Sequence, residues 1–146
     1  MTQAEGTSQR DAGSYGSPGG SATRSARTMI APLMQFSLEL EADSLRLEPE
    51  YRTGDRNSRT LAKETDLRVL MTVLRAGAAL DEQDGDARAT VQVLDGTATL
   101  QVDGAEAHLD PAEVAVVDRG RPWLLRADSD CAVVVTIVWP PEKVDV

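Results

Sequence analysis

A succession of short apolar stretches, separated by turn residues from about residue 59 to 139, constrains the fold of this chain most strongly. The stretches are short enough to be single strands, and no segment shows a convincing helical period over more than about two turns. Strands of this length at this spacing are typical of all-β sandwiches and barrels. The pattern therefore predicts an all-β fold and excludes a parallel α/β sheet, which needs helices between its strands.

Two Asp-Gly pairs, at residues 95–96 and 103–104, punctuate the middle of this region. Each pair suits a two-residue hairpin turn, because Gly and Asp tolerate the positive φ that such turns require. Both pairs are therefore predicted to be hairpin turns. The expected strands are residues 36–41, 44–48, 59–63, 67–75, 89–94, 97–102, 105–109, 114–117, 123–127 and 132–139, with polar loops at 51–58 and 81–88.

The first 28 residues have a different composition, since 14 of them are Gly, Ser or Thr and Met1 is the only large aliphatic residue. Such a segment cannot bury enough apolar surface to offset the entropy lost on ordering. We predict a disordered tail over residues 1–33, a β-domain over 35–141 and a short C-terminal tail over 142–146. Met1, Met29 and Met34 are each compatible with a translation start.

The charge of the chain bears on its partners. The formal net charge is -9, from 24 acidic and 15 basic residues. A field of this sign repels nucleic-acid phosphates and anionic lipids, so we expect no nucleic acid and no membrane as partner. The longest apolar stretch, residues 132–139, is far shorter than the roughly 20 residues of a membrane helix. Since no secretory signal is visible at the N-terminus, a cytoplasmic location is expected.

The single cysteine and the single histidine are candidates for reactivity. Cys131 adjoins a run of valines, so we expect a buried, inert thiol, and a lone cysteine forms no intramolecular disulfide. In residues 105–109 the alternation places Ala105, Ala107 and Leu109 on the core face. His108 is therefore expected to point outward, on the surface.

Two groups of charged residues have ordinary explanations. The acidic residues of the segment 81–86 lack the full pattern of a calcium-binding loop, so we expect a solvated loop. Arg52, Arg56 and Arg59 could bind an anion. Pairing with neighbouring acids such as Glu50 and Asp55 is the expected arrangement.

The segment from Leu74 to Trp123 resembles the cupin family, and the resemblance covers roughly residues 59 to 139. Gly77 is followed by five residues and then by Gln83-Asp84-Gly85, where the first cupin motif has His-x-His. Ala89 stands where that motif has Glu, and Gly96 closes it with the right spacing. Residues 104–123 resemble the second motif, through Pro111-Ala112-Glu113 and Pro122-Trp123. Since cupins are double-sheet jelly rolls, the resemblance implies a cupin-type antiparallel jelly-roll β-barrel.

The resemblance also implies where a metal site would be. In metal-binding cupins three His and one Glu hold the ion, and the matching positions here are Gln83, Gly85, Ala89 and Trp123. None of these side chains is a competent ligand, because transition metals need several imidazole or carboxylate donors. We therefore expect no metal, no cofactor and none of the family's metal-dependent chemistry.

The interior of the predicted barrel is apolar. If Ala89 points inward, the period of two places Val91 and Val93 on the same face. Trp123 would fill much of the space vacated by the ligands. The interior is then either packed solid or open to a small apolar or aromatic molecule, with Gln83 as its polar handle. The candidate pocket consists of Gln83, Ala89, Val91, Val93, Leu100 and Trp123.

Three functions remain open from the sequence. The first is a metal-free cupin domain that binds a small molecule or acts as a scaffold. The second is an enzyme of cupin type, either metal-free and isomerase-like or metal-dependent with relocated ligands. The third is a regulatory or protein-interaction module. The resemblance also implies a homodimer, which we expect to form through the apolar N-terminal strand near Phe36.

Overall fold

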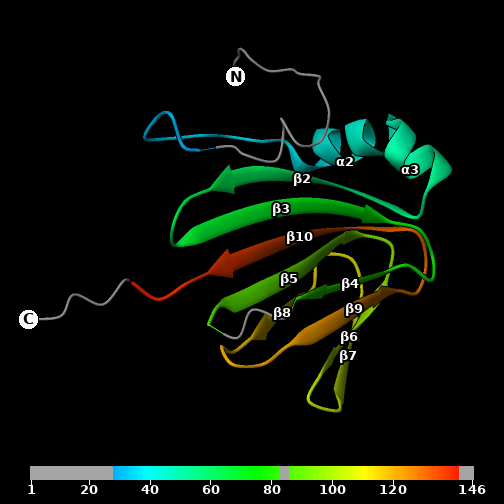
Figure 1. The fold of residues 1–146 in the computed structure, drawn as a ribbon. Coiled ribbons are helices and arrows are strands. Elements are labelled where there is room, and N and C mark those ends of the chain that lie inside the picture. Colours follow the sequence, from blue (N-terminus) through cyan, green and yellow to red (C-terminus); the bar gives the residue numbers. More distant parts are fainter. Residues whose placement is uncertain (1–27, 83–85, 142–146) are drawn as a thin grey trace, which may run out of the picture.

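Two antiparallel sheets form the body of the protein in the computed structural model, which describes residues 28–82 and 86–141 (Figure 1). The all-β prediction is confirmed for this body. The five-stranded sheet has the order β2 (Arg56–Lys63), β3 (Leu67–Leu74), β10 (Cys131–Val138), β5 (Arg88–Asp95) and β8 (Val114–Val117). The four-stranded sheet has the order β4 (Ala79–Glu82), β9 (Trp123–Ala127), β6 (Ala98–Val102) and β7 (Ala105–Leu109).

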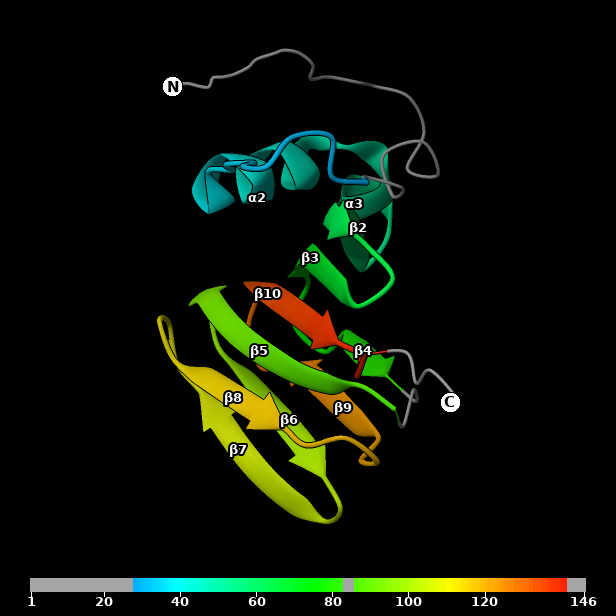
Figure 2. The same ribbon diagram turned by 90° about the vertical axis from the view of Figure 1, so that its left-hand side faces the viewer.

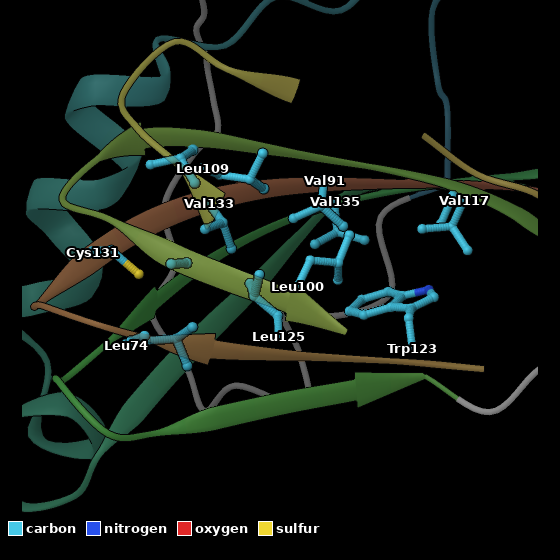
Figure 3. Packing of buried hydrophobic residues seen from close by; sticks show 14 of the residues in the cluster. Leu74, Val91, Leu100, Leu109, Val117, Trp123, Leu125, Cys131, Val133 and Val135 are labelled. Carbon is cyan, nitrogen blue, oxygen red and sulfur yellow. The ribbon is translucent and has the colours of Figure 1, made fainter. Parts of the chain in front are cut away.

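The main core lies between the two sheets, because alternate residues of their strands point inward. On β5 the inward residues are Ala89, Val91 and Val93, and each is buried. Leu100 on β6 and Leu125 on β9 meet them from the other sheet (Figure 3). The alternation of apolar and polar residues along β5 thus determines which face of its sheet packs against the other sheet.

Two helices precede the sheets, α2 (Leu38–Leu47) and α3 (Pro49–Thr53). The predicted strands at residues 36–41 and 44–48 are therefore wrong. So is the expected dimer contact through a strand near Phe36, since no strand forms there. The Ser37 hydroxyl caps α2 by accepting a hydrogen bond from the backbone N–H of Leu40. Ala42 and Leu45 lie on one buried face of this helix. Their helical spacing was overlooked because the leucines also alternate as in a strand.

The helices cover part of the outer face of the five-stranded sheet, over β2 and β3 (Figure 2). A second apolar cluster fills this contact; it consists of Ala42, Leu45, Tyr51, Leu61, Met71, Val73, Ala132 and Val134. The Arg59 guanidinium on β2 lies in the same layer and donates to carboxylates of Glu41 and Glu48, at 2.7 Å each. The helices are thus held to the sheet by both apolar packing and buried ion pairs.

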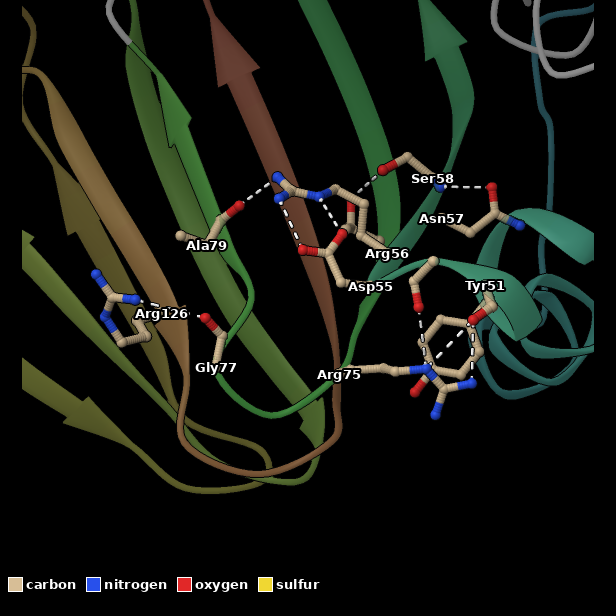
Figure 4. A network of polar contacts seen from close by, with 11 residues as sticks. Tyr51, Asp55, Arg56, Asn57, Ser58, Arg75, Gly77, Ala79 and Arg126 are labelled. Carbon is tan, nitrogen blue, oxygen red and sulfur yellow. Dashed lines mark hydrogen bonds and ion pairs between the residues drawn. The ribbon is translucent and has the colours of Figure 1, made fainter.

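Polar contacts tie this helical layer to the end of β3 and join the two sheets to each other (Figure 4). The Arg75 guanidinium donates to the carbonyl oxygens of Tyr51 and Gly54 and stacks on the Tyr51 ring, 4.2 Å from its centroid. Arg56 of the five-stranded sheet donates to the carbonyl oxygen of Ala79, at the start of β4 in the other sheet. Side chains thus bridge the sheets where no strand does.

The two Asp-Gly turns behave differently. At residues 103–104 both φ angles are positive, 51° and 80°, and the turn joins the paired strands β6 and β7, as predicted. The prediction of a hairpin at residues 95–96 is wrong, because β5 and β6 belong to different sheets. Gly96 has a φ of 74°, and a Cβ there would lie 2.1 Å from the Asp130 carbonyl oxygen. Glycine at this position lets the chain cross from one sheet to the other in close contact with the backbone of Asp130.

Three further expectations need correction. The predicted loop at residues 51–58 contains the end of α3 and the start of β2. The predicted loop at 81–88 begins with the end of β4. Ala105 and Ala107 are exposed, because β7 is an edge strand of which only Leu109 reaches the core.

The ends of the described body converge on the β2–β3 turn, residues 64–66. The backbone N–H of Met29 donates to a Glu64 carboxylate oxygen at 2.8 Å, and that of Trp139 donates to the Asp66 carbonyl oxygen at 3.1 Å. Within residues 28–82 and 86–141, no helix is long and apolar enough to cross a membrane. The predicted C-terminal tail at residues 142–146 and residues 1–27 of the predicted N-terminal tail at 1–33 lie outside the described residues.

Candidate functional site

The candidate site is the end of the interior that contains Trp123. The structure brings together five of the six residues predicted from the sequence, in the cluster between the sheets. They are Ala89, Val91, Val93, Leu100 and Trp123, all buried. Gln83 and Gly85 lie outside the described residues, so the predicted polar handle is not part of the site as described.

Trp123 begins β9, in the middle of the four-stranded sheet. In register it pairs with Glu82 of β4 on one side and Val102 of β6 on the other. Only 5% of its surface is exposed, and its ring lies between the sheets near Val117, whereas Cys131 lies towards the opposite end (Figure 3). A tryptophan of this size and burial fills a large part of its end of the interior.

The surroundings of this cluster are apolar as well as its centre. Partly buried apolar side chains pack against it from both sheets and from the residue after β10; they are Leu70, Leu80, Val102, Ala115 and Trp139. These side chains combine contact with the core and contact with solvent.

The described residues do not fit the metal that the cupin resemblance implies. Ala89 and Trp123 stand at two of the four ligand positions, and neither side chain offers a donor for a transition metal. In the part of the chain that the structure describes, no group of three or more His, Cys, Asp or Glu side chains could hold an ion. No chemical step through a metal can be derived from these residues.

The thiol of Cys131 is buried at the other end of the interior, as predicted. Burial, reinforced by the negative charge of Asp95, raises the pKa of the Cys131 thiol to about 11. The thiol therefore stays protonated at neutral pH, and a protonated thiol is a poor nucleophile.

His108 points outward from the four-stranded sheet, as predicted, and its side chain is 57% exposed. Its Nε2 lies 3.2 Å from an Asp110 carboxylate oxygen, and its Nδ1 lies 3.2 Å from one of Asp128. The two carboxylates thus hold the imidazole from opposite sides on the outer surface. His108 therefore lies on the outer surface, away from the interior cluster, and is not placed to act as a general base for a molecule bound there.

The three arginines differ in their surroundings. Arg56 pairs with Asp55 at 3.0 Å, as expected, and Arg52 is exposed. Arg59 is buried, and its partners are Glu41 and Glu48 of the helical layer rather than the neighbouring acids named from the sequence. Glu41 lies in α2, and Glu48 is the extended residue between α2 and α3, so these partners can be recognised only once the helices are.

Comparison with solved structures identifies the fold. The cupin domain of an XRE family transcriptional regulator from Enterobacter cloacae matches with a TM-score of 0.55 and 19% identity, over 60% of this chain and 99% of that domain. An RmlC-like cupin from Desulfovibrio desulfuricans matches with a TM-score of 0.52 and 22% identity, over 57% of this chain and 82% of that one. The chain has the cupin fold. No protein-family model and no curated protein matches the sequence.

A third structure matches more of the chain than the cupin sheets. It is a conserved protein of unknown function from Streptococcus pyogenes, with a TM-score of 0.63 and 22% identity, over 81% of this chain and 97% of that one. Residues 56–146 make up less than two-thirds of the chain, so this match extends into the segment before β2.

Proposed function

We propose that this cupin-fold protein is a non-catalytic binding domain that takes a small apolar or aromatic molecule at the Trp123 end of its interior. The observation that carries the proposal is the chemistry of the former ligand positions, where the buried side chains of Ala89 and Trp123 replace metal donors. A ligand there would exchange water contacts for contacts with aromatic and aliphatic side chains.

The residue types of the interior favour binding over catalysis. Among the described residues, the buried charged side chains are Glu41 and Arg59, which pair with each other in the helical layer, and the raised pKa of the buried Cys131 thiol keeps it neutral. General acid–base catalysis needs a titratable group within hydrogen-bond reach of the substrate. A metal-free isomerase would therefore need catalytic residues from outside this cluster, which makes an enzyme the weaker alternative. A scaffold with a filled interior is the other alternative.

Melting curves of chelator-treated protein test the proposal, with a panel of neutral compounds that starts with toluene and cyclohexanol. A ligand at 100 times its dissociation constant stabilises the folded state by about 2.7 kcal/mol. For a domain of this size the melting temperature should rise by about 10 °C. In the variant Trp139→Phe, Trp123 is the only tryptophan, and its fluorescence should change over the same concentration range.

Two matched variants locate the binding. Ala115 is half-buried against the interior cluster, whereas its neighbour Val116 points outward. Ala115→Phe should remove the thermal shift, because it places a phenyl ring against the interior cluster, and Val116→Phe should keep it. Equal loss in both variants, or no shift with any compound of the panel, would contradict binding inside the sheets. A shift with iron, manganese, nickel or zinc alone would instead support a metal site.

A further inference from the structure

One arginine lies on the inward face of the five-stranded sheet, at the end of the interior that contains Trp123. Register pairs Arg68 of β3 with Ile137 of β10, and Ile137 with Ala89 of β5. Residues that pair directly across antiparallel strands lie on the same face of their sheet. Ile137 and Ala89 are both buried in the interior cluster, so Arg68 extends the same inward row to β3. In the other direction the row continues from Ala89 to Val117, beside the Trp123 ring (Figure 3).

Arg68 differs from the other described arginines that are at least partly buried. Arg46 donates to one carboxylate, Arg59 to two, and Arg75 to carbonyl oxygens. The Nε of Arg68 is buried without a hydrogen-bond partner, as is that of Arg59, whose terminal nitrogens are satisfied. In the part of the chain that the structure describes, no carboxylate pairs with the Arg68 guanidinium. A partly buried charge without a partner is costly, so this guanidinium favours an acceptor from outside the chain.

The Trp139 ring covers one face of the Arg68 guanidinium, whose central carbon lies 5.1 Å from the ring centroid. Trp139 also packs against the interior cluster, so the arginine lies at the wall of the interior. A cation–π contact uses the flat face of a guanidinium and leaves its in-plane N–H groups able to donate. Two such donors in parallel match the two oxygens of a carboxylate. Apolar surroundings strengthen this pairing, because they lower the local dielectric constant.

A second cation lies beside Arg68. Register pairs it with Lys63 of β2, which is exposed. In the turn between these strands, the Glu64 carboxylate accepts a hydrogen bond from the backbone N–H of Met29, and Asp66 is exposed. A chain with a net charge of -9 repels anions in general, so a site for an anion needs cations at its rim. Lys63 and Arg68 supply them at this end of the interior.

We propose that the molecule bound at the Trp123 end is a small carboxylic acid with an aromatic or aliphatic body, whose carboxylate pairs with Arg68. Its body packs against Trp123 and the apolar row, and its carboxylate accepts hydrogen bonds from the terminal nitrogens of the arginine. Arg68 and Ala89 lie two strand spacings apart, about 10 Å, which the arginine side chain and such an acid span together. This inference rests on the proposed binding function and adds the charge of the ligand to it. Neutral molecules of the same shape bind more weakly, because they make the apolar contacts without the ion pair.

Isothermal titration calorimetry of the chelator-treated full chain at neutral pH compares phenylacetate with phenylacetamide, which has nearly the same shape and no charge. Phenylacetate should bind at least about tenfold more tightly, because a hydrogen bond to a charged group contributes more than one between neutral groups. Arg68→Met should weaken the binding of phenylacetate alone and bring the two affinities within about twofold of each other. Arg52→Met removes the same charge from an exposed position of α3, so it is the matched control and should keep the preference.

The outcomes separate this inference from the binding function on which it rests. Equal affinity for the two compounds, or binding of neutral compounds alone, would overturn the carboxylate and leave the binding function standing. So would a preference that survives Arg68→Met, or one that Arg52→Met abolishes. If neither phenylacetate nor any neutral compound binds, the proposed function itself fails. Circular dichroism checks that each variant is folded, and Arg68→Lys, which keeps the charge without the planar fork, should show a smaller preference of the same sign.

Discussion

Replacing Arg59 with methionine should destabilise the protein strongly. The Arg59 side chain is 8% exposed, and its Glu41 partner is 5% exposed. Removing one partner of a buried ion pair costs about 3–5 kcal/mol, because the other charge stays buried without compensation. Glu48 is 21% exposed and keeps a hydrogen bond from Asn57 Nδ2, so Glu41 accounts for most of the cost. We expect a loss of about 3 kcal/mol in the free energy of unfolding.

Urea denaturation followed by circular dichroism measures this loss. The double variant Arg59→Met with Glu41→Leu removes the stranded charge as well and should recover most of the stability. Arg88→Met is the control, because Arg88 and Asp118 are 54% and 70% exposed and such surface pairs contribute about 0–1 kcal/mol. The reasoning is refuted if Arg59→Met costs no more than Arg88→Met, or if the double variant is no more stable than the single one.

Two further predictions concern backbone and thiol. Gly96→Ala should cost more than about 2 kcal/mol by urea denaturation, whereas Gly104→Ala, with a φ of 80° and nothing within 4 Å of its Cβ, should cost about 1–2 kcal/mol for the positive φ alone. Equal costs would show that the contact with Asp130 does not matter. Cys131 should resist thiol reagents in the native protein at neutral pH and react in urea. Since its pKa rises from 9.0 to about 11 on folding, stability should fall as pH rises through this range. Cys131→Ala should lose that part of the pH dependence.

The strands were most predictable where turn residues bound them on both sides. Residues 105–109, 114–117 and 123–127 form β7, β8 and β9 with the expected limits. Each follows a Gly or Pro segment that stops the preceding element, so a short apolar run between such residues has few alternatives. The alternation of inward residues on β5 followed from the same period.

The helix α2 was missed because two periods coexist in its sequence. Leu38 and Leu40 alternate as in a strand, whereas Leu38, Ala42 and Leu45 follow a helical face. Ser37 as a cap and the acidic first turn were the signals that favour the helix. Once the helix is missed, the buried partners of Arg59 cannot be predicted, because Glu41 and Glu48 are distant from it in the sequence and only the helical layer brings them close.

The convergence of Met29 and Trp139 on one turn has a consequence for engineering. Both backbones are hydrogen-bonded to residues 64–66, so the described part of the chain begins and ends near the same corner (Figure 1). Neighbouring ends of this kind allow circular permutation and insertion of a whole domain into a host loop. A permuted chain with a short linker at this corner, opened at the exposed residues 119–121, keeps every strand pairing of both sheets.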